Sequence, residues 1–204
     1  MNHRIDSIEN INRVLGQSSK PGSSDFDLNP GGRPFQPPKN WLREAAVLVP
    51  LIGAKTDLRV ILTKRASHLK HHPGQIAFPG GKVEKTDRDH TAAALREAQE
   101  EIGLSPRDVK VLGHIPFHET VTHFRITPVV GLVGGSFIPV PEIGEVEEVF
   151  EVPLVYLADP NNYQIEGRIW GGVRRQYFTI PYGPYYIWGA TARILQGFAE
   201  RLSK

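Results

Sequence analysis

Cysteine is absent from the sequence, and this absence removes a whole group of sites from consideration. Without thiols there is no disulfide framework, no zinc site held by thiolates and no cysteine nucleophile. A metal ion bound by this chain must therefore be held by oxygen atoms or by imidazole nitrogens.

Long apolar runs and a dominant charge are also missing. No segment approaches the roughly 20 apolar residues that span a bilayer, and the N-terminal residues lack the apolar run of a signal peptide. The 24 Lys and Arg side chains nearly balance the 22 Asp and Glu side chains, so the charge gives no argument for nucleic acid. We therefore expect a cytoplasmic protein that binds neither a membrane nor nucleic acid. The sequence leaves both a monomer and a homodimer open.

The composition divides the chain into two parts. Residues 1–38 predict a flexible N-terminal tail, because Gly, Pro, Ser and Asn accumulate there with little apolar surface to bury. Within them, residues 6–15 have the pattern of a short amphipathic helix, and a tail packed along the domain surface is an equally good interpretation. Residues 39–204 are long enough and apolar enough to bury the core of one domain.

Apolar, β-rich runs separated by turn residues predict most of the strands. Residues 43–53 and 58–66 predict an antiparallel pair. Further strands are expected within residues 109–120, 125–135, 148–157 and 175–189. Residues 189–202 have apolar positions at helical spacing and predict a closing helix. Strands around one central helix, with a second helix at the end, predict an α/β fold with a mixed sheet between helical layers.

The central helix is expected over residues 87–102. Thr86 and Asp89 resemble a capping box at its start, and Gly103 suits a C-terminal cap. Helical spacing gathers small and apolar side chains on one face, namely Thr91, Ala94, Leu95, Ala98 and Ile102.

Three glutamates, Glu97, Glu100 and Glu101, fall together roughly opposite this face. Like charges at such spacing repel by roughly 0.2–0.5 kcal/mol per pair, and Arg96 supplies one cation against three anions. A solvated polar face is the ordinary interpretation of such a cluster. Something further is needed to favour a functional site.

That further feature is the pair Gly80 and Gly81, which end the sequence FPGG just before the helix. Two adjacent glycines let backbone amides approach a phosphate closely. Carboxylate oxygens are the ligands preferred by Mg²⁺ and Mn²⁺, which in turn bind phosphate oxygens. The segment therefore predicts a Mg²⁺ or Mn²⁺ site on the three glutamates, facing a phosphate group.

These residues resemble the Nudix box, whose pattern is G-x5-E-x7-R-E-U-x-E-E-x-G-U with U aliphatic. Gly81, Asp87 and the run REAQEEIGL at residues 96–104 occupy its positions. Asp87 stands where the box has Glu, and eight residues rather than seven separate it from Arg96. The resemblance extends from about Trp41 to the C-terminus, and it implies a Nudix-type α/β/α sandwich that hydrolyses a nucleoside diphosphate linked to another group.

A second motif lies directly upstream. Residues 61–81, ILTKRASHLKHHPGQIAFPGG, are similar to the signature of the coenzyme A pyrophosphatase branch of the family, LLTxRSx3Rx3Gx3FPGG. Ile61, Ala66 and Lys70 are mild departures from it. This branch also often carries the Asp and the longer spacing seen here. The resemblance implies cleavage of coenzyme A and its thioesters to 3′,5′-ADP and 4′-phosphopantetheine or its acyl form.

The resemblance also implies roles for the site residues. Glu97, Glu100 and Glu101 would hold Mg²⁺ or Mn²⁺, with Glu100 alternatively acting as the base that deprotonates water. Arg96 would orient the glutamates. A second set of candidates for the base lies directly before the run VFEVPL at residues 149–154, although surface charge is the better interpretation of each: Glu145, Glu147 and Glu148.

Arg65, Lys70, Gly80 and Gly81 are the expected contacts to substrate phosphates. One of the two cations would meet the 3′-phosphate of coenzyme A, and ordinary surface cations are the alternative interpretation for both.

Histidine and aromatic clusters are less informative. His68, His71 and His72 have helical spacing, but Pro73 and Gly74 interrupt any helix, so a zinc site is not favoured. The sequence selects none of His114, His118 and His123 as a substrate contact. Tyr182, Tyr185, Tyr186 and Trp188 are expected to pack in the core or on the surface rather than to stack on adenine.

Two other functions compete with a coenzyme A diphosphatase. A Nudix hydrolase for ADP-ribose, NADH or nucleoside triphosphates would carry the same box, and only its activity on a panel of substrates would distinguish it. A catalytically inactive Nudix ligand sensor is the other alternative, and the presence of all three glutamates and of Arg96 argues against it.

Overall fold

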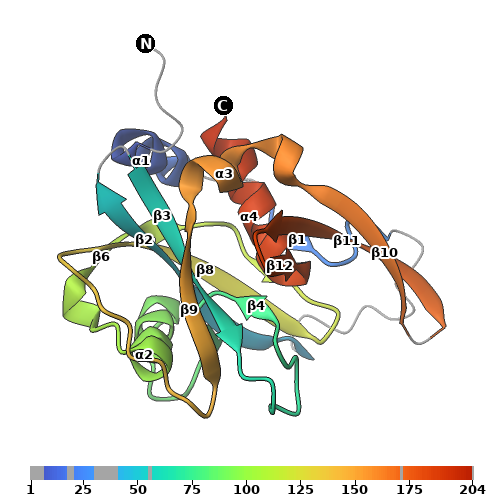
Figure 1. The fold of residues 1–204 in the computed structure, drawn as a ribbon, viewed down its shortest axis with the longest axis horizontal. Coiled ribbons are helices and arrows are strands. Elements are labelled where there is room, and N and C mark those ends of the chain that lie inside the picture. Colours follow the sequence, from blue (N-terminus) through green and yellow to red (C-terminus); the bar gives the residue numbers. More distant parts are fainter. Residues whose placement is uncertain (1–6, 18–20, 30–40, 55–56, 171, 204) are drawn as a thin grey trace.

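The structure is a computed structural model that describes residues 7–17, 21–29, 41–54, 57–170 and 172–203. Within these residues a central sheet lies between α2 (His90–Ile102) on one face and a helical layer on the other (Figure 1). That layer consists of α1 (Ile8–Gly16), α3 (Leu154–Ala158) and α4 (Gly189–Leu202). The expected α/β fold with a mixed sheet between helical layers is confirmed.

Three long strands form the middle of the sheet. Strand β2 (Arg43–Ala54) pairs antiparallel with β3 (Asp57–Arg65), as expected, and parallel with β8 (Phe124–Val133). The main path of the sheet runs β1-β7-β8-β2-β3-β4, while β5, β6 and β9 pair with β2, β8 and β3. The remaining strands of this sheet are β1 (Ser23–Ser24), β4 (Ile76–Ala77), β5 (Gly80–Lys82), β6 (Val109–His114), β7 (His118–Glu119) and β9 (Val146–Pro153).

The alternation of side chains along β2 divides the core into two layers. Ala46 and Leu48 pack with the small side chains of α2 on one face. Val49 and Leu51 belong to the larger core on the opposite face, with residues of α1, α3 and α4. Packing against this face of the sheet therefore fixes the position of α2, the glutamate-bearing helix.

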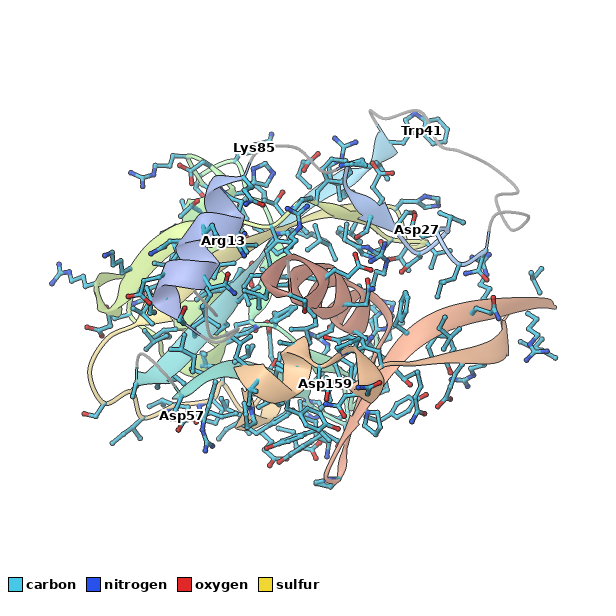
Figure 2. The ribbon with its side chains drawn as sticks, turned by 90° about the horizontal axis from the view of Figure 1, so that it is seen from above. Arg13, Asp27, Trp41, Asp57, Lys85 and Asp159 are labelled. Atoms are coloured by element: carbon cyan, nitrogen blue, oxygen red, sulfur yellow. The ribbon has the colours of Figure 1, made fainter. Side chains whose placement is uncertain are left out.

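Helix α1, in the segment expected to form a short amphipathic helix, is part of the larger core. Ile11 and Val14 are fully or almost fully buried. Asn10 donates from Nδ2 to the Leu202 carbonyl at 3.0 Å, and α1 lies beside α4 in the view of Figure 2, where Arg13 marks α1. The other parts of the predicted tail, residues 1–6, 18–20 and 30–38, lie outside the described residues.

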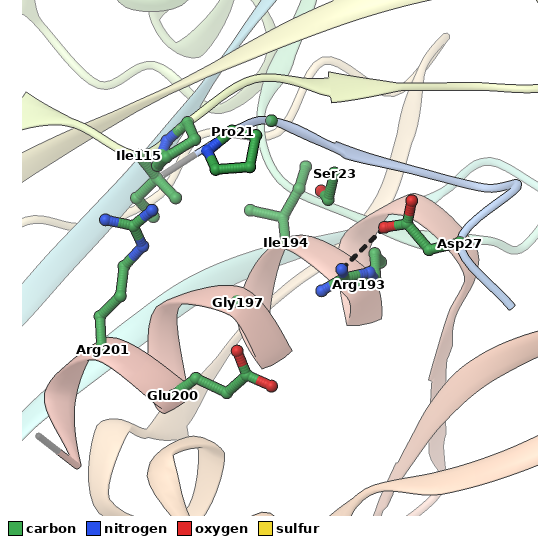
Figure 3. Close-up of a pocket in the computed structure, with 11 residues that line it drawn as sticks. Pro21, Ser23, Asp27, Ile115, Arg193, Ile194, Gly197, Glu200 and Arg201 are labelled. Carbon is green, nitrogen blue, oxygen red and sulfur yellow. Dashed lines mark hydrogen bonds and ion pairs between the residues drawn. The ribbon is translucent and has the colours of Figure 1, made fainter. Parts of the chain in front are cut away.

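A second N-terminal segment, residues 21–29, is held to the domain mainly by polar contacts. Strand β1 pairs parallel with β7, and the buried His118 hydrogen-bonds Ser23 Oγ and Asp25 Oδ1, both at 3.0 Å. Asp27 forms an ion pair of 2.8 Å with Arg193 of α4 (Figure 3). Because polar groups rather than apolar surface attach this segment, its composition alone suggested a tail.

The C-terminal half differs from expectation in two places. Only residues up to Pro153 of the strand expected at 148–157 are extended, and Leu154–Ala158 form α3. Strand β10 (Gln164–Trp170) was not expected, because it lacks a continuous apolar run and its side chains are mostly exposed. It pairs with β11 (Val173–Tyr182), which pairs with β12 (Tyr185–Trp188), in a separate antiparallel sheet.

Short 3-10 turns at Pro106–Asp108 and Pro160–Asn162 complete the described elements. None of the helices in the described part of the chain has the length and apolar character needed to cross a membrane.

Candidate active site

The glutamate-bearing helix α2 begins three residues later than the sequence predicts. Its N-cap is Asp89, whose Oδ1 accepts a 2.8 Å hydrogen bond from the Ala92 amide, so the cap expected at Thr86 is wrong. Gly103 is the C-cap as expected, with a φ of 72° that favours glycine. The displaced start leaves Asp87 in the loop before the helix.

The three glutamates do not share one exposed face. Glu101 is only 5% exposed and lies among the buried residues of α2, whereas Glu97 is half-buried and Glu100 is exposed. Ala93, Ala94, Ala98 and Ile102 form the buried face, with Thr91 and Leu95 at its margins. The predicted arrangement is therefore corrected: the glutamates run from the edge of the core out to solvent.

Gly80 and Gly81 allow β5 to lie against both β2 and α2. A Cβ on Gly80 would come within 2.5 Å of the Ala46 carbonyl oxygen, and one on Gly81 would come within 2.6 Å of the Glu97 carboxylate. The Gly80 amide donates to Glu101 Oε2 at 3.2 Å. In this structure the amide expected to face a phosphate therefore holds a glutamate in place.

Arg96 joins the loop before the helix to the glutamates. Its Nε and Nη2 donate to Asp87 Oδ1 and Oδ2, both at 3.0 Å. Its Nη1 donates to Glu97 Oε1 and Glu100 Oε2, both at 2.9 Å. Arg96 thus contacts both glutamates. Asp87, for which no role was predicted, holds Arg96. The acidic position of the box was the signal that pointed to Asp87.

Burial leaves the negative charge of the site poorly compensated. Burial is the largest cause that raises the pKa of Glu101 to about 8, and the nearby Glu97 and Glu145 act in the same direction, while the Gly80 amide and Arg65 oppose them. Burial also raises the pKa of Glu97, although its hydrogen bond to Arg96 acts in the opposite direction. Hydrogen bonding to Arg96 lowers the pKa of Asp87. A cation beside Glu97 and Glu101 would favour their charged forms.

The fit of these residues to a divalent cation rests on donor chemistry. Among the described residues, no three His, Asp or Glu side chains are grouped so that they could hold a metal ion as they stand. Arg96 engages Glu97 and Glu100 instead. Their oxygen-only donor set matches Mg²⁺ and Mn²⁺. Burial, the largest cause of the raised pKa values of Glu97 and Glu101, disfavours their charged forms, and a bound cation would act in the opposite direction. The residues therefore fit such an ion by chemistry.

The structure separates the candidates for the general base. Glu145 is exposed but lies close enough to raise the pKa values of both Glu97 and Glu101. Glu147 instead accepts from Lys64 Nζ at 2.6 Å, and Glu148 accepts from the Tyr185 hydroxyl. Of the three, Glu145 is the one whose charge acts on the glutamates of α2.

The two candidate cations for substrate phosphates lie in different surroundings. Arg65, at the end of β3, is close enough to oppose the rise of the pKa of Glu101 and to lower that of His72. Lys70 is exposed in the loop between β3 and β4. Arg65 is therefore beside the glutamates, whereas no described contact brings Lys70 to them.

The remaining histidines and aromatic residues have mainly structural surroundings. His114 hydrogen-bonds the Thr91 hydroxyl at 3.0 Å, and His123 occupies a turn with a φ of 64°. Tyr185 stacks on Phe150, and Tyr182 packs against Tyr156. His68 and His71 are exposed in the loop that also carries His72, and Tyr186 donates to Glu166 at 2.8 Å. Trp188 is the exception, since it lines a cavity.

That cavity has a volume of about 590 Å³ and opens beside the glycines. His72, Phe78 and Gly80 line its near end, while the three-stranded sheet, α4 and residues 24–29 supply other walls. A smaller cavity of about 300 Å³ lies between the N-terminal segment and α4 (Figure 3). Sequence reasoning missed both, because segments far apart in the chain line them.

Comparisons with known proteins identify sequences and folds that are similar to this chain. The NUDIX domain model matches residues 42–167. The chain is 41% identical over 160 residues to a protein of Salmonella paratyphi B named "Uncharacterized Nudix hydrolase NudL", a match that covers 78% of this chain and 83% of that protein. The relative from Salmonella enteritidis with the same printed name matches equally well.

Among solved structures, the MutT protein from Methanosarcina mazei Go1 has a similar fold. The TM-score is 0.50 at 17% sequence identity, over 79% of this chain and 93% of that one. This likeness concerns the architecture of the α/β/α sandwich alone.

Proposed function

The chain belongs to the Nudix family, and from this membership we propose that it is a hydrolase that cleaves the diphosphate of coenzyme A and its thioesters. The products would be 3′,5′-ADP and 4′-phosphopantetheine or its acyl form. Hydrolysis of a diphosphate is supported by the box at residues 81–104, and the choice of coenzyme A by the similarity of residues 61–81 to the signature of that branch.

One observation carries the catalytic part of the proposal, namely that Arg96 holds Glu97 and Glu100 through a single nitrogen. Glu101 is fixed independently, by the Gly80 amide. Two separate sets of hydrogen bonds thus hold the carboxylates at the junction of α2 and β5. A cluster of unrelated surface acids would have neither set. The arrangement supports a site that binds one or more cations.

Glu97 and Glu101 are the residues that we propose as the main ligands of Mg²⁺ or Mn²⁺, with Glu100 as a further ligand. When bound, such an ion neutralises the diphosphate and lowers the pKa of a coordinated water. Releasing Glu97 and Glu100 to this role requires Arg96 to give up some of its hydrogen bonds to them, while Asp87 keeps its guanidinium in place.

The other residues bind the substrate and move the proton. We propose that Arg65, close to Glu101, contacts the diphosphate. We propose Lys70 as a second contact, to either the phosphopantetheine half or the nucleotide half of the substrate. Gly80 lines the larger cavity, and the absence of a side chain on Gly81 leaves space for the Glu97 carboxylate. Glu145, exposed and close to Glu97 and Glu101, is the candidate that would take the proton of the attacking water, with Glu100 as the alternative.

Product analysis tests this function directly. The purified full-length chain is incubated with coenzyme A and either Mg²⁺ or Mn²⁺, and the products are separated and identified. We expect equal amounts of 3′,5′-ADP and 4′-phosphopantetheine, and none with EDTA.

A panel with acetyl-coenzyme A, ADP-ribose, NADH and a nucleoside triphosphate then ranks the substrates. Better turnover of ADP-ribose, NADH or the triphosphate would overturn the coenzyme A assignment and leave a Nudix hydrolase of another substrate. Binding without hydrolysis across the whole panel would instead identify a ligand sensor.

A further inference from the structure

The larger cavity has a feature that the proposed reaction does not explain. Arg168 and Arg175 are directly opposite each other in the pairing of β10 with β11, so their side chains share one face of the hairpin. Both line the cavity. Two like charges at such a cross-strand position repel each other, and together they give this end of the hairpin a positive character.

The acidic side chain in the cavity lining already has other partners. Asp25 accepts hydrogen bonds from His118 Nε2 at 3.0 Å and from the Val121 amide at 2.8 Å. Arg193, a third arginine of the lining, forms an ion pair with Asp27. The described lining therefore carries three arginines, two of them on the hairpin, and one acidic side chain.

Aromatic side chains accompany this charge. Tyr177 and Trp188 line the cavity with their ring centroids 5.5 Å apart, and Phe124 and Phe178 line it as well. Flat rings of this kind bury and stack a nucleobase at little cost in side-chain entropy. At about 590 Å³, the cavity is within the range of sites that hold a drug-sized ligand.

One residue contacts both the cavity and the reaction site. Gly80 lines the cavity and donates its amide to Glu101. His72 lines the same end and lies close to Arg65. A molecule with its diphosphate at the glutamates can therefore extend one half into the cavity.

We propose that this cavity binds the phosphorylated nucleoside half of the substrate, with the base among the aromatic side chains and a ribose phosphate at Arg168 and Arg175. The proposal rests on the proposed function, in which that half is the 3′-phosphorylated adenosine of coenzyme A. It moves recognition of the 3′-phosphate from Arg65 or Lys70 to the hairpin of the second sheet. Residues 24–29 become one wall of a substrate site.

Binding of 3′,5′-ADP to the full-length protein in EDTA tests the cavity without any turnover. Isothermal titration calorimetry compares 3′,5′-ADP with 5′-AMP and with 4′-phosphopantetheine, for the wild type, Arg168→Ala, Arg175→Ala and the control Arg174→Ala. Arg174 is exposed on the same strand, but it pairs with Ile169 and does not line the cavity. Thermal melting of each variant checks that it is folded.

We expect 3′,5′-ADP to bind more tightly than 5′-AMP. Arg168→Ala and Arg175→Ala should each weaken binding of 3′,5′-ADP by roughly 10- to 150-fold, the range of a charge-assisted hydrogen bond, and leave 5′-AMP almost unchanged. Arg174→Ala should change neither. Equal effects of Arg168→Ala and Arg174→Ala would overturn the proposal, and so would tighter binding of 4′-phosphopantetheine that depends on Arg168.

Turnover separates this proposal from the proposed function. If coenzyme A is hydrolysed but Arg168→Ala leaves the kcat/KM ratio of coenzyme A to dephospho-coenzyme A intact, the cavity proposal fails and the function stands. If 3′,5′-ADP binding depends on Arg168 and Arg175 but coenzyme A is not hydrolysed, the assigned function fails and the nucleotide site stands. If only Lys70→Ala lowers the kcat/KM ratio of coenzyme A to dephospho-coenzyme A, recognition of the 3′-phosphate would belong to Lys70, in the loop between β3 and β4.

Discussion

Asp87 and Arg96 form a two-pronged ion pair, in which Nε donates to Oδ1 and Nη2 to Oδ2, both at 3.0 Å. The pair is formed across the start of α2, and the Asp87 side chain is only 5% exposed. Because the remaining nitrogen of Arg96 contacts Glu97 and Glu100, the pair sets where both carboxylates lie. A residue outside the helix thus determines the geometry of the site on it.

Asp87→Asn should reduce activity without unfolding the protein. The amide cannot accept both charge-assisted hydrogen bonds, so Arg96 loses its fixed orientation, and kcat should fall by roughly 10- to 150-fold. Steady-state kinetics at saturating Mg²⁺ measures this, with Glu84→Gln, an exposed acid of the same loop, as the control. Wild-type kcat in Asp87→Asn would show that Arg96 needs no such support.

Glu101→Gln should remove most of the activity and leave the fold intact. The amide keeps the shape of the side chain but gives up the charge that we assign to metal binding, so kcat/KM should fall on the order of 10³-fold or more. Glu142→Gln, which alters an exposed acid nearby, serves as the control. Near-normal turnover of Glu101→Gln at saturating Mg²⁺ would remove Glu101 from the ligands.

The metal-free protein should become less stable between about pH 5 and pH 8. Glu101 has an ordinary pKa of 4.5 in the unfolded chain, and burial raises it to about 8 in the folded protein. The folded state therefore binds this proton more tightly. The resulting stability is fully present below about pH 4.5 and is lost as the pH rises through about 8.

Urea unfolding in EDTA at several pH values measures this effect as the difference between wild type and Glu101→Gln. The difference in free energy of unfolding should favour the variant increasingly as the pH rises. A difference that does not change with pH would mean that Glu101 is already charged in the folded protein. Addition of Mg²⁺ at pH 8 should stabilise the wild type more than the variant.

Ile11→Ala should destabilise the domain by about 2–5 kcal/mol, because Ile11 is completely buried beneath the sheet. Asn12→Ala, its exposed neighbour on α1, should change the free energy of unfolding little. Chemical denaturation of both variants provides the measurement. Equal stability of the two variants would show that α1 contributes little to the stability of the domain.

Arg65→Ala should lower kcat/KM for coenzyme A and for dephospho-coenzyme A by the same factor. The guanidinium lies close to Glu101, so we expect it to act on the diphosphate that both substrates share. Parallel kinetics with the two substrates gives the ratio. A narrowed preference for coenzyme A in this variant would assign the 3′-phosphate to Arg65 instead.

The sequence predicted the strands that contain apolar, β-rich runs, among them β2, β3 and β8, and the helix that carries the glutamates. It did not predict that Glu101 is buried, because a helical pattern gives the angle of a side chain but not the element that covers it. The helix start was misplaced since Asp87 is drawn to Arg96, a partner nine positions later, instead of remaining within the helix. Strand β10 lacks the apolar pattern that marks a strand, since most of its side chains are exposed.

The contact between Asn10 and the Leu202 carbonyl joins positions that are 192 residues apart. During synthesis on a ribosome, α1 leaves the exit tunnel well before α4, against which it packs. The larger core therefore cannot be completed until α4 has left the tunnel. Until then, Ile11 and Val14 stay without their C-terminal partners, and a chain halted before α4 would expose apolar surface that chaperones and proteases recognise.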